Sequence, residues 1–213
     1  MGFDPEKDRM RREATRQKLL ETGLRVFAEK TIDAVNLTDI AKEAGYGMAT
    51  VYRYFNSKQE LVLAIGTWMW QNFGEVSNHT FNREDMTAAE ELAFFLDSFI
   101  VLYQTSRDVL RFNQFFNIYV QREGIPAEDM RPYMSVIELF QERLHKTFEK
   151  GKKDGTLRAD IQEKEAFSTM LHLMLAAVTR YAVGLVYESG TDPEKELLFL
   201  RNLLLQAYRT DSE

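Results

Sequence analysis

The segment LTDIAKEAGYGMATVYRYFNSKQEL, residues 37–61, contains two short apolar stretches separated by a glycine-flanked turn. Ala41, Gly45 and Val51 are the residue types that two helices need when they cross steeply over a short turn. A small residue allows close approach, glycine permits positive φ in the turn, and an aliphatic side chain fills the shared core. The remaining apolar contacts are expected from Ile40, Ala44 and Phe55. This spacing predicts a helix-turn-helix.

The second helix of such a unit enters the major groove of DNA, with its first residues at the base edges. If Val51 and Phe55 are buried, Ala49 and Arg53 point outward. Arg53 can then donate two hydrogen bonds to a guanine, while Lys58 can neutralise a phosphate at the start of the next helix. The predicted DNA-contacting residues are Asn36, Thr38, Met48, Ala49, Thr50, Tyr52, Arg53, Tyr54 and Lys58. The alternative is an ordinary helical hairpin whose aromatic residues only pack.

Apolar residues recur at helical spacing along almost the whole chain, and no segment alternates convincingly with a period of two. Asn36 and Ser57 are expected to cap the helices that follow them. The predicted helices span 13–30, 36–45, 48–55, 57–76, 87–106, 107–123, 125–155, 163–189 and 192–209. We therefore predict an all-α protein of about nine helices.

Composition limits the possible chemistry. The 213 residues include no cysteine, which excludes thiol catalysis, disulfides and cysteine-bound zinc, and suits a reducing compartment. The N-terminal stretch 1–13 is charged and lacks the apolar core of a signal peptide. The apolar tract 171–187 carries His172 and Arg180, so it is interpreted as a buried helix rather than a membrane span. A soluble cytoplasmic protein is expected.

The net charge of −6 is distributed unevenly. Residues 1–70 hold 11 Lys and Arg against 10 Asp and Glu, a net of +1, whereas the remaining 143 hold 16 against 23, a net of −7. The acidity thus belongs to the C-terminal part. It does not argue against DNA binding by the N-terminal part, because the distribution of charge matters more than its sum.

Residues 19–63 resemble the DNA-binding domain of the TetR/AcrR family of bacterial transcriptional regulators. The matching motif consists of Ile40-Ala41, Ala44-Gly45, Thr50-Val51-Tyr52, Tyr54-Phe55 and Ser57-Lys58. Gly47 stands where the family often has a capping serine, and Tyr54 where histidine is frequent. The segment 151–161 is similar to a common interhelical segment of the family. The resemblance implies a three-helix DNA-binding domain, residues 1–56, and a larger ligand-binding and dimerisation domain, residues 57–213, with helix 57–76 linking the two.

The resemblance also implies a homodimer formed by the last two helices, a palindromic operator and a small-molecule effector. Two apolar stripes suit such an interface: Leu171, Leu175, Val178, Ala182, Leu185, Leu197, Leu200, Leu204 and Tyr208. Each stripe could equally face the core of its own domain. Candidate pocket residues are rings and thioethers: Trp68, Phe95, Phe99, Tyr103, Phe112, Phe115, Phe116, Tyr119, Met170 and Met174. They favour an apolar or aromatic effector, although such residues more often form core.

No catalytic constellation is apparent. Glu142 and His145 have the spacing of a di-iron helix motif, but those sites need a second such pair, and neither His79 nor His172 supplies one. The stretch GKKDGT, residues 151–156, departs from the phosphate-binding loop. We therefore predict neither enzyme activity nor a cofactor nor a metal. The predicted function is a ligand-responsive DNA-binding regulator, most simply a repressor; the alternative is a small-molecule-binding or scaffold protein with a vestigial DNA-binding domain.

Overall fold

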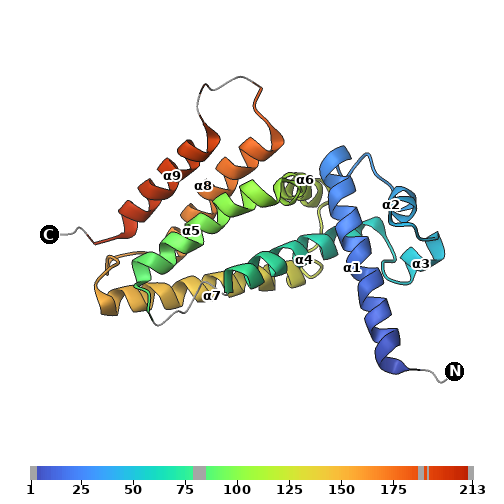
Figure 1. Ribbon diagram of the computed structural model, residues 1–213, viewed down its shortest axis with the longest axis horizontal. Coiled ribbons are helices and arrows are strands. Elements are labelled where there is room, and N and C mark those ends of the chain that lie inside the picture. Colours follow the sequence, from blue (N-terminus) through green and yellow to red (C-terminus); the bar gives the residue numbers. More distant parts are fainter. Residues whose placement is uncertain (1–3, 79–84, 187–189, 191, 211–213) are drawn as a thin grey trace. The chain divides into compact units, whose positions relative to one another are not determined.

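The computed structural model describes residues 4–78, 85–186, 190 and 192–210, and these residues form nine helices and no strand (Figure 1). The helices are α1 (Pro5–Lys30), α2 (Leu37–Ala44), α3 (Met48–Tyr52), α4 (Lys58–Asn78), α5 (Ala88–Thr105), α6 (Arg107–Glu123), α7 (Arg131–Asp154), α8 (Glu163–Val183) and α9 (Pro193–Tyr208). The predicted all-α class is confirmed.

Several helices begin or end at other residues than predicted, because a glycine, a proline or a capping residue sets the boundary. Helix α1 begins at Pro5 rather than at residue 13, because the Asp4 carboxylate accepts hydrogen bonds from the first-turn amides and proline suits the first helical position. The predicted helix 125–155 begins only at Arg131, after a turn that starts at Pro126.

Two further ends are shorter than predicted. Helix α8 ends at Val183, since Gly184 has a φ of 115°, a conformation that helices do not use. Residues 187–189 of the predicted helix 163–189 lie outside the described part. Helix α3 ends at Tyr52 rather than at Phe55, and the chain continues in turns toward Ser57.

The chain divides into two compact units. The first comprises Met1–Met69 and Arg111–Tyr133, and the second comprises Trp70–Leu110 and Met134–Glu213. Helix α4 belongs to both, since its residues up to Met69 lie in the first unit and those from Trp70 lie in the second. The functional boundary predicted between residues 56 and 57 stays a prediction.

The first unit has a continuous apolar core that joins α1, α4 and α6. Phe27 of α1 and Phe112 of α6 are both fully buried, and their ring centroids lie 6.2 Å apart. Gly23 of α1 faces Ile65 of α4 at close range. Outside this core, an ion pair of 2.6 Å between Arg25 and Glu43 ties α1 to α2. The helix-turn-helix is therefore attached to α1, which packs against α4 and α6.

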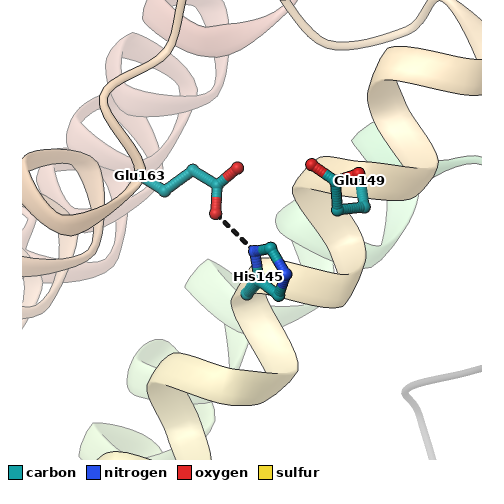
Figure 2. A group of neighbouring side chains, drawn as sticks. All are labelled: His145, Glu149 and Glu163. Atoms are coloured by element: carbon teal, nitrogen blue, oxygen red, sulfur yellow. Dashed lines mark hydrogen bonds and ion pairs between the residues drawn. The ribbon is translucent and has the colours of Figure 1, made fainter.

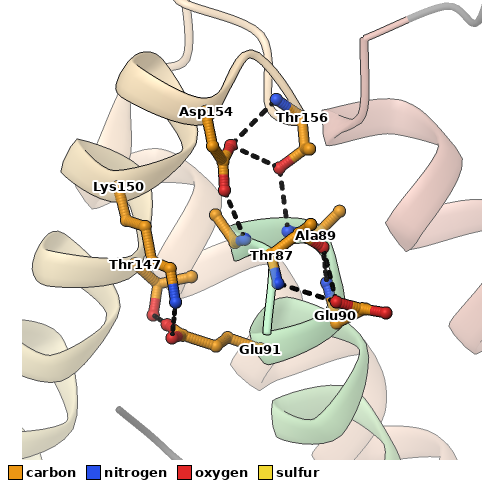
Figure 3. Close-up of polar contacts among 9 residues, drawn as sticks. Thr87, Ala89, Glu90, Glu91, Thr147, Lys150, Asp154 and Thr156 are labelled. Atoms are coloured by element: carbon orange, nitrogen blue, oxygen red, sulfur yellow. Dashed lines mark hydrogen bonds and ion pairs between the residues drawn. The ribbon is translucent and has the colours of Figure 1, made fainter. Parts of the chain in front are cut away.

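In the second unit, α5 packs against both α8 and α9, which lie side by side (Figure 1). The N-terminus of α5 is fixed by polar contacts from the end of α7 (Figure 3). The carboxylate of Glu91, only 2% exposed, accepts hydrogen bonds from Lys150 at 2.6 Å and from Thr147 at 2.8 Å. Asp154 accepts a bond of 2.8 Å from the amide of Ala88. A buried carboxylate paired in this way locks α5 to α7, because removing one partner would leave an uncompensated charge.

Helix α8 is long and apolar enough to cross a membrane, judged by length and composition alone, and 39% of its apolar window is buried in the fold. A single helix of this kind is weak evidence for a membrane span, because a core helix of a soluble protein has the same length and composition. Its buried residues include Met170, Met174 and Val178, which are fully covered by the second unit.

Candidate nucleic-acid interface

The core of the helix-turn-helix is formed by the residues that the spacing predicted. Ile40, Ala41, Ala44, Val51 and Phe55 are all buried, with exposures between 0% and 3%. Gly45 ends α2 in the left-handed conformation, with φ of 75° and ψ of 29°, where another residue would be strained. The predicted turn is therefore confirmed, and with it the orientation of α3.

The face of α3 opposite Val51 is open to solvent. Ala49 and Arg53 are exposed, and Tyr52 is 53% exposed. Met48, Thr50 and Tyr54 are half-buried beside them. Gly47 is the N-cap of α3 and provides no side-chain hydrogen bond, so the first amides of α3 keep free donors at the helix N-terminus. This face can therefore offer a guanidinium, hydroxyls and backbone amides to a duplex.

The start of α2 presents two more predicted contact residues. Asn36 and Thr38 are both exposed. Asn36 is the N-cap, as predicted, and its amide donates to the Asp39 carboxylate at 2.8 Å. Asp39 thus occupies the first turn of α2, where a negative charge stabilises the helix dipole.

Lys58 is the first residue of α4, and its ammonium is half-buried beside the loop that precedes α2. The cap predicted at Ser57 is confirmed, since its hydroxyl accepts the amide of Glu60 at 3.1 Å. The Lys58 ammonium lies 3.5 Å from the carbonyl oxygen of Asp33. Burial lowers the pKa of Lys58 from its ordinary value, while the nearby Asp33 carboxylate opposes that shift. The contact with the Asp33 carbonyl oxygen therefore orients the ammonium before any phosphate binds.

Sequence reasoning did not identify Asp33 or Arg122. The guanidinium of Arg122, at the end of α6, donates to both carboxylate oxygens of Asp33, with Nη2 at 2.5 Å from Oδ1. These hydrogen bonds hold the pKa of Asp33 below its ordinary value. Arg122 also pairs with the neighbouring Glu123. The two partners lie 89 positions apart in the sequence, so no local pattern could have related them. Together they connect α6 to the loop beside Lys58.

The predicted pocket residues are divided between the two units. Trp68, Phe112, Phe115, Phe116 and Tyr119 belong to the first unit, whereas Phe95, Phe99, Tyr103, Met170 and Met174 belong to the second. Eight of the ten are buried, and only Trp68 and Phe115 are half-buried. Their packing is that of aromatic core: Phe95 and Phe99 meet edge to face at 5.4 Å, for example. Their role in ligand binding stays a prediction.

The second unit contains a hollow of about 370 Å³ that none of the predicted pocket residues lines. Its walls are the C-terminal half of α4, between residues 70 and 75, and the first half of α7, between residues 136 and 143. Trp70 and Phe140 form part of the wall, and Arg143 also lines the hollow. Aromatic periodicity did not reveal this hollow, because most of its lining consists of glycine, aliphatic and polar residues, among them Arg143 of α7.

Four residues of the predicted dimer interface instead fill the core of their own unit. Val178, Ala182, Leu197 and Leu204 are between 0% and 6% exposed. This is the alternative that the stripes left open, and it arises because α8 and α9 must cover α5. Leu171, Leu175, Leu185, Leu200 and Tyr208 are half-buried. The apolar residues that α8 and α9 expose most are Leu173, Val183, Leu198, Phe199 and Leu203.

His145 does not pair with Glu142 in the way a di-iron motif would require. Its Nδ1 lies 2.6 Å from a carboxylate oxygen of Glu163, at the start of α8, and Glu149 lies one turn further along α7 (Figure 2). Ligand atoms of these three residues lie within 4.8 Å of one another. The ammonium of Lys152 contacts Glu149 at 2.6 Å and Glu163 at 2.9 Å. Lys152 thus pairs with both carboxylates, and these contacts tie α7 to α8.

Comparison with known proteins agrees with this geometry. Residues 19–65 match the family model described as bacterial regulatory proteins, tetR family. The chain is 21% identical over 185 residues to the HTH-type transcriptional regulator YvdT of Bacillus subtilis, covering 86% of this chain and 90% of that protein. It is 27% identical over 184 residues to the HTH-type transcriptional repressor KstR2 of Rhodococcus jostii, covering 84% and 86%.

The fold also matches solved structures. The transcriptional regulator FadR of Bacillus subtilis, solved in complex with stearoyl-CoA, superposes with a TM-score of 0.71 at 19% identity, covering 89% of this chain and 95% of that one. An N-terminal helix-turn-helix with an exposed α3, followed by a larger helical part, defines a DNA-binding transcriptional regulator. The chain is therefore similar to regulators of the tetR family: its residues 19–65 match that family's model, and most of its length aligns with HTH-type transcriptional regulators. Regulators of this family bind DNA and small-molecule effectors, and dimerisation is typical of them.

Proposed function

We propose that the protein is a cytoplasmic repressor that binds a palindromic operator as a homodimer and releases it when a small molecule binds the second unit. The single observation that carries the proposal is the orientation of α3. Val51 is fully buried while Ala49 and Arg53 on the other side are exposed. The open face carries an arginine and a tyrosine, whose side chains can donate hydrogen bonds to bases and phosphates, and this supports contact with a duplex.

Within this proposal, six of the nine predicted residues divide into two roles. Arg53, Ala49 and Thr50 read base edges in the major groove, since an arginine pairs with guanine and small apolar groups meet the thymine methyl. Lys58 and the hydroxyls of Tyr52 and Tyr54 contact phosphates, which fixes the register without reading sequence. Asn36 and Thr38, at the start of α2, and Met48, at the start of α3, are the remaining proposed contacts.

The proposed dimer uses the exposed apolar side of α8 and α9 rather than the buried stripe. Leu198, Phe199 and Leu203 lie on α9 and are between 47% and 63% exposed, and Leu173 on α8 is 45% exposed. Helix-turn-helix regulators read two half-sites about one helical turn apart, which requires a two-fold dimer. An exposed apolar face on the last two helices supports this arrangement.

The proposed control operates through α4, which belongs to both units. Lys58 lies at its start in the first unit, and Trp70 lies in its second half. A ligand that binds better when α4 is displaced shifts the population away from the DNA-binding state. The shift cannot exceed the difference between the ligand's affinities for the two states.

Selection of bound duplexes from a random DNA pool tests the proposal. We expect a palindrome whose half-sites lie about 10 base pairs apart, centre to centre. Affinity for the selected duplex should fall steeply as salt rises, because each phosphate contact releases counterions. A pool that remains random after several rounds would contradict the proposal and favour a vestigial DNA-binding domain.

A further inference from the structure

The hollow between α4 and α7 has the features of a small-molecule site. Its volume of about 370 Å³ lies within the range of such sites, about 300–1,000 Å³. One wall is aromatic: the rings of Trp70 and Phe140 meet edge to face, with centroids 6.3 Å apart. Gly74 allows this wall to form, since a Cβ there would lie 3.3 Å from Cζ of Phe140. The wall suits the flat or aliphatic body of a ligand.

Arg143 provides the hollow with a positive charge and hydrogen-bond donors. Its side chain is half-buried, and its Nη1 donates to the carbonyl oxygen of Gly74 at 3.0 Å. The guanidinium also lies 5.7 Å from the centre of the Phe140 ring. Within the described part of the chain, no carboxylate lies within ion-pair distance of it. Burial lowers its pKa from the ordinary value.

An arginine in this setting favours an anion. A guanidinium has five N–H donors in a planar fork that matches a carboxylate. The contact with Gly74 uses one of them and orients the group. Partial burial removes part of the guanidinium's hydration. A bound anion would replace the lost hydrogen bonds and stabilise the positive charge. The same site would not stabilise a cationic ligand.

Glu75 limits the charge of the ligand. It lines the same hollow from α4 and is exposed. Its carboxylate would repel a second negative charge on the ligand, so a monoanion fits better than a dianion. Gln71, also exposed at the rim, adds a neutral donor and acceptor.

We propose that this hollow binds a small organic monocarboxylate, with Arg143 pairing the carboxylate and Trp70 and Phe140 contacting the apolar body. The inference rests on the proposed function, since it names the chemical class of the effector.

Calorimetric titration of the full chain tests the inference. Three probe pairs separate charge from shape: hexanoate, 4-phenylbutyrate and 1-naphthylacetate, each with its primary amide. We expect at least one carboxylate to bind about tenfold more tightly than its amide, because charge-assisted hydrogen bonds exceed neutral ones. Three carboxylates that bind no better than their amides would overturn the inference.

Substitutions assign any such preference to the hollow. In Arg143→Gln, carboxylate and amide should bind within about twofold of each other, whereas Arg143→Lys should retain part of the preference, since it keeps charge but loses the fork. Arg180→Gln is the matched control, because Arg180 is an exposed arginine on α8 of the same unit. A preference that survives Arg143→Gln, or that Arg180→Gln removes, would overturn the inference.

Glu75→Gln distinguishes a monoanion from a zwitterion. The substitution should leave carboxylate affinity unchanged or raise it. If L-phenylalanine binds more tightly than 4-phenylbutyrate and loses affinity in Glu75→Gln, the site takes amino acids and the proposed class is wrong.

Operator binding by the wild-type chain is measured separately in the same buffer. A chain that binds its operator but no carboxylate refutes only the inference, whereas carboxylate binding without operator binding refutes only the proposed function.

Discussion

Helix α3 carries predicted DNA contacts, and helix α8 carries predicted dimer contacts. Ala49 on α3 is exposed as predicted, whereas Val178 on α8 is buried in its own unit. Helix α3 has five residues and one buried side chain, Val51, so its open face follows from a single contact. Helix α8 has apolar residues on its buried and on its exposed side, and Val178 and Ala182 are buried rather than open to a partner. A periodic stripe identifies a buried face, but it does not say whether a partner or the same chain buries it.

The largest expected effect concerns this buried stripe. Val178→Asp should lower the free energy of unfolding by about 3 kcal/mol or more, because it places an unpaired charge in a fully buried site. Urea unfolding followed by circular dichroism measures the change. A loss below about 1 kcal/mol would show that Val178 is exposed in the protomer and would favour the dimer interface predicted from the sequence.

The exposed side of α9 should respond in the opposite way. Phe199→Asp is expected to change the stability of the protomer by less than about 0.5 kcal/mol, since Phe199 is 63% exposed. In the dimer, the substitution occurs twice across a two-fold axis and should raise the dissociation constant by about 30-fold or more, as at an interface hot spot. Sedimentation velocity over a concentration series measures it. An unchanged dissociation constant would show that the dimer interface does not include Phe199.

On α3, Arg53→Ala should relax base preference at one position in each half-site, by about 1–3 kcal/mol of discrimination. Binding to operators substituted at each position, followed by fluorescence anisotropy, measures the loss. Arg180→Ala serves as the control. Equal weakening on every duplex would make Arg53 a phosphate contact instead.

Lys58→Ala should show the complementary behaviour. We expect it to weaken binding to all duplexes similarly and to reduce the slope of log affinity against log salt by about one. The comparison requires titrations at several salt concentrations. A change in base preference at one position would contradict the assignment to phosphate.

The smallest expected effect concerns Asp33. Its pKa in the folded protein is lowered by Arg122, so this contact stabilises the fold above the ordinary carboxyl pKa and is lost as pH falls through the lowered value. The free energy of unfolding should therefore decline more steeply below about pH 4 in the wild type than in Asp33→Asn. Both side chains are about half exposed, so solvent screening keeps the effect small. Identical acid profiles would show that the contact contributes nothing to stability.

Local chemistry explains why part of the molecule was predictable. The caps at Asn36 and Ser57 and the left-handed Gly45 each depend on residues within a few positions, and all are confirmed. The contacts between Arg122 and Asp33 and between Arg143 and Gly74 join residues 89 and 69 positions apart. Such pairs follow from how helices pack, which one sequence does not encode in any short pattern.

The most direct test is the ratio between two affinities of the wild-type chain, one for the duplex selected from the random pool and one for a scrambled duplex of the same composition. Measured at one fixed salt concentration, the selected duplex should bind at least about 1,000-fold more tightly, as sequence-specific readers do. Equal affinity for both duplexes would mean that the open face of α3 reads no bases.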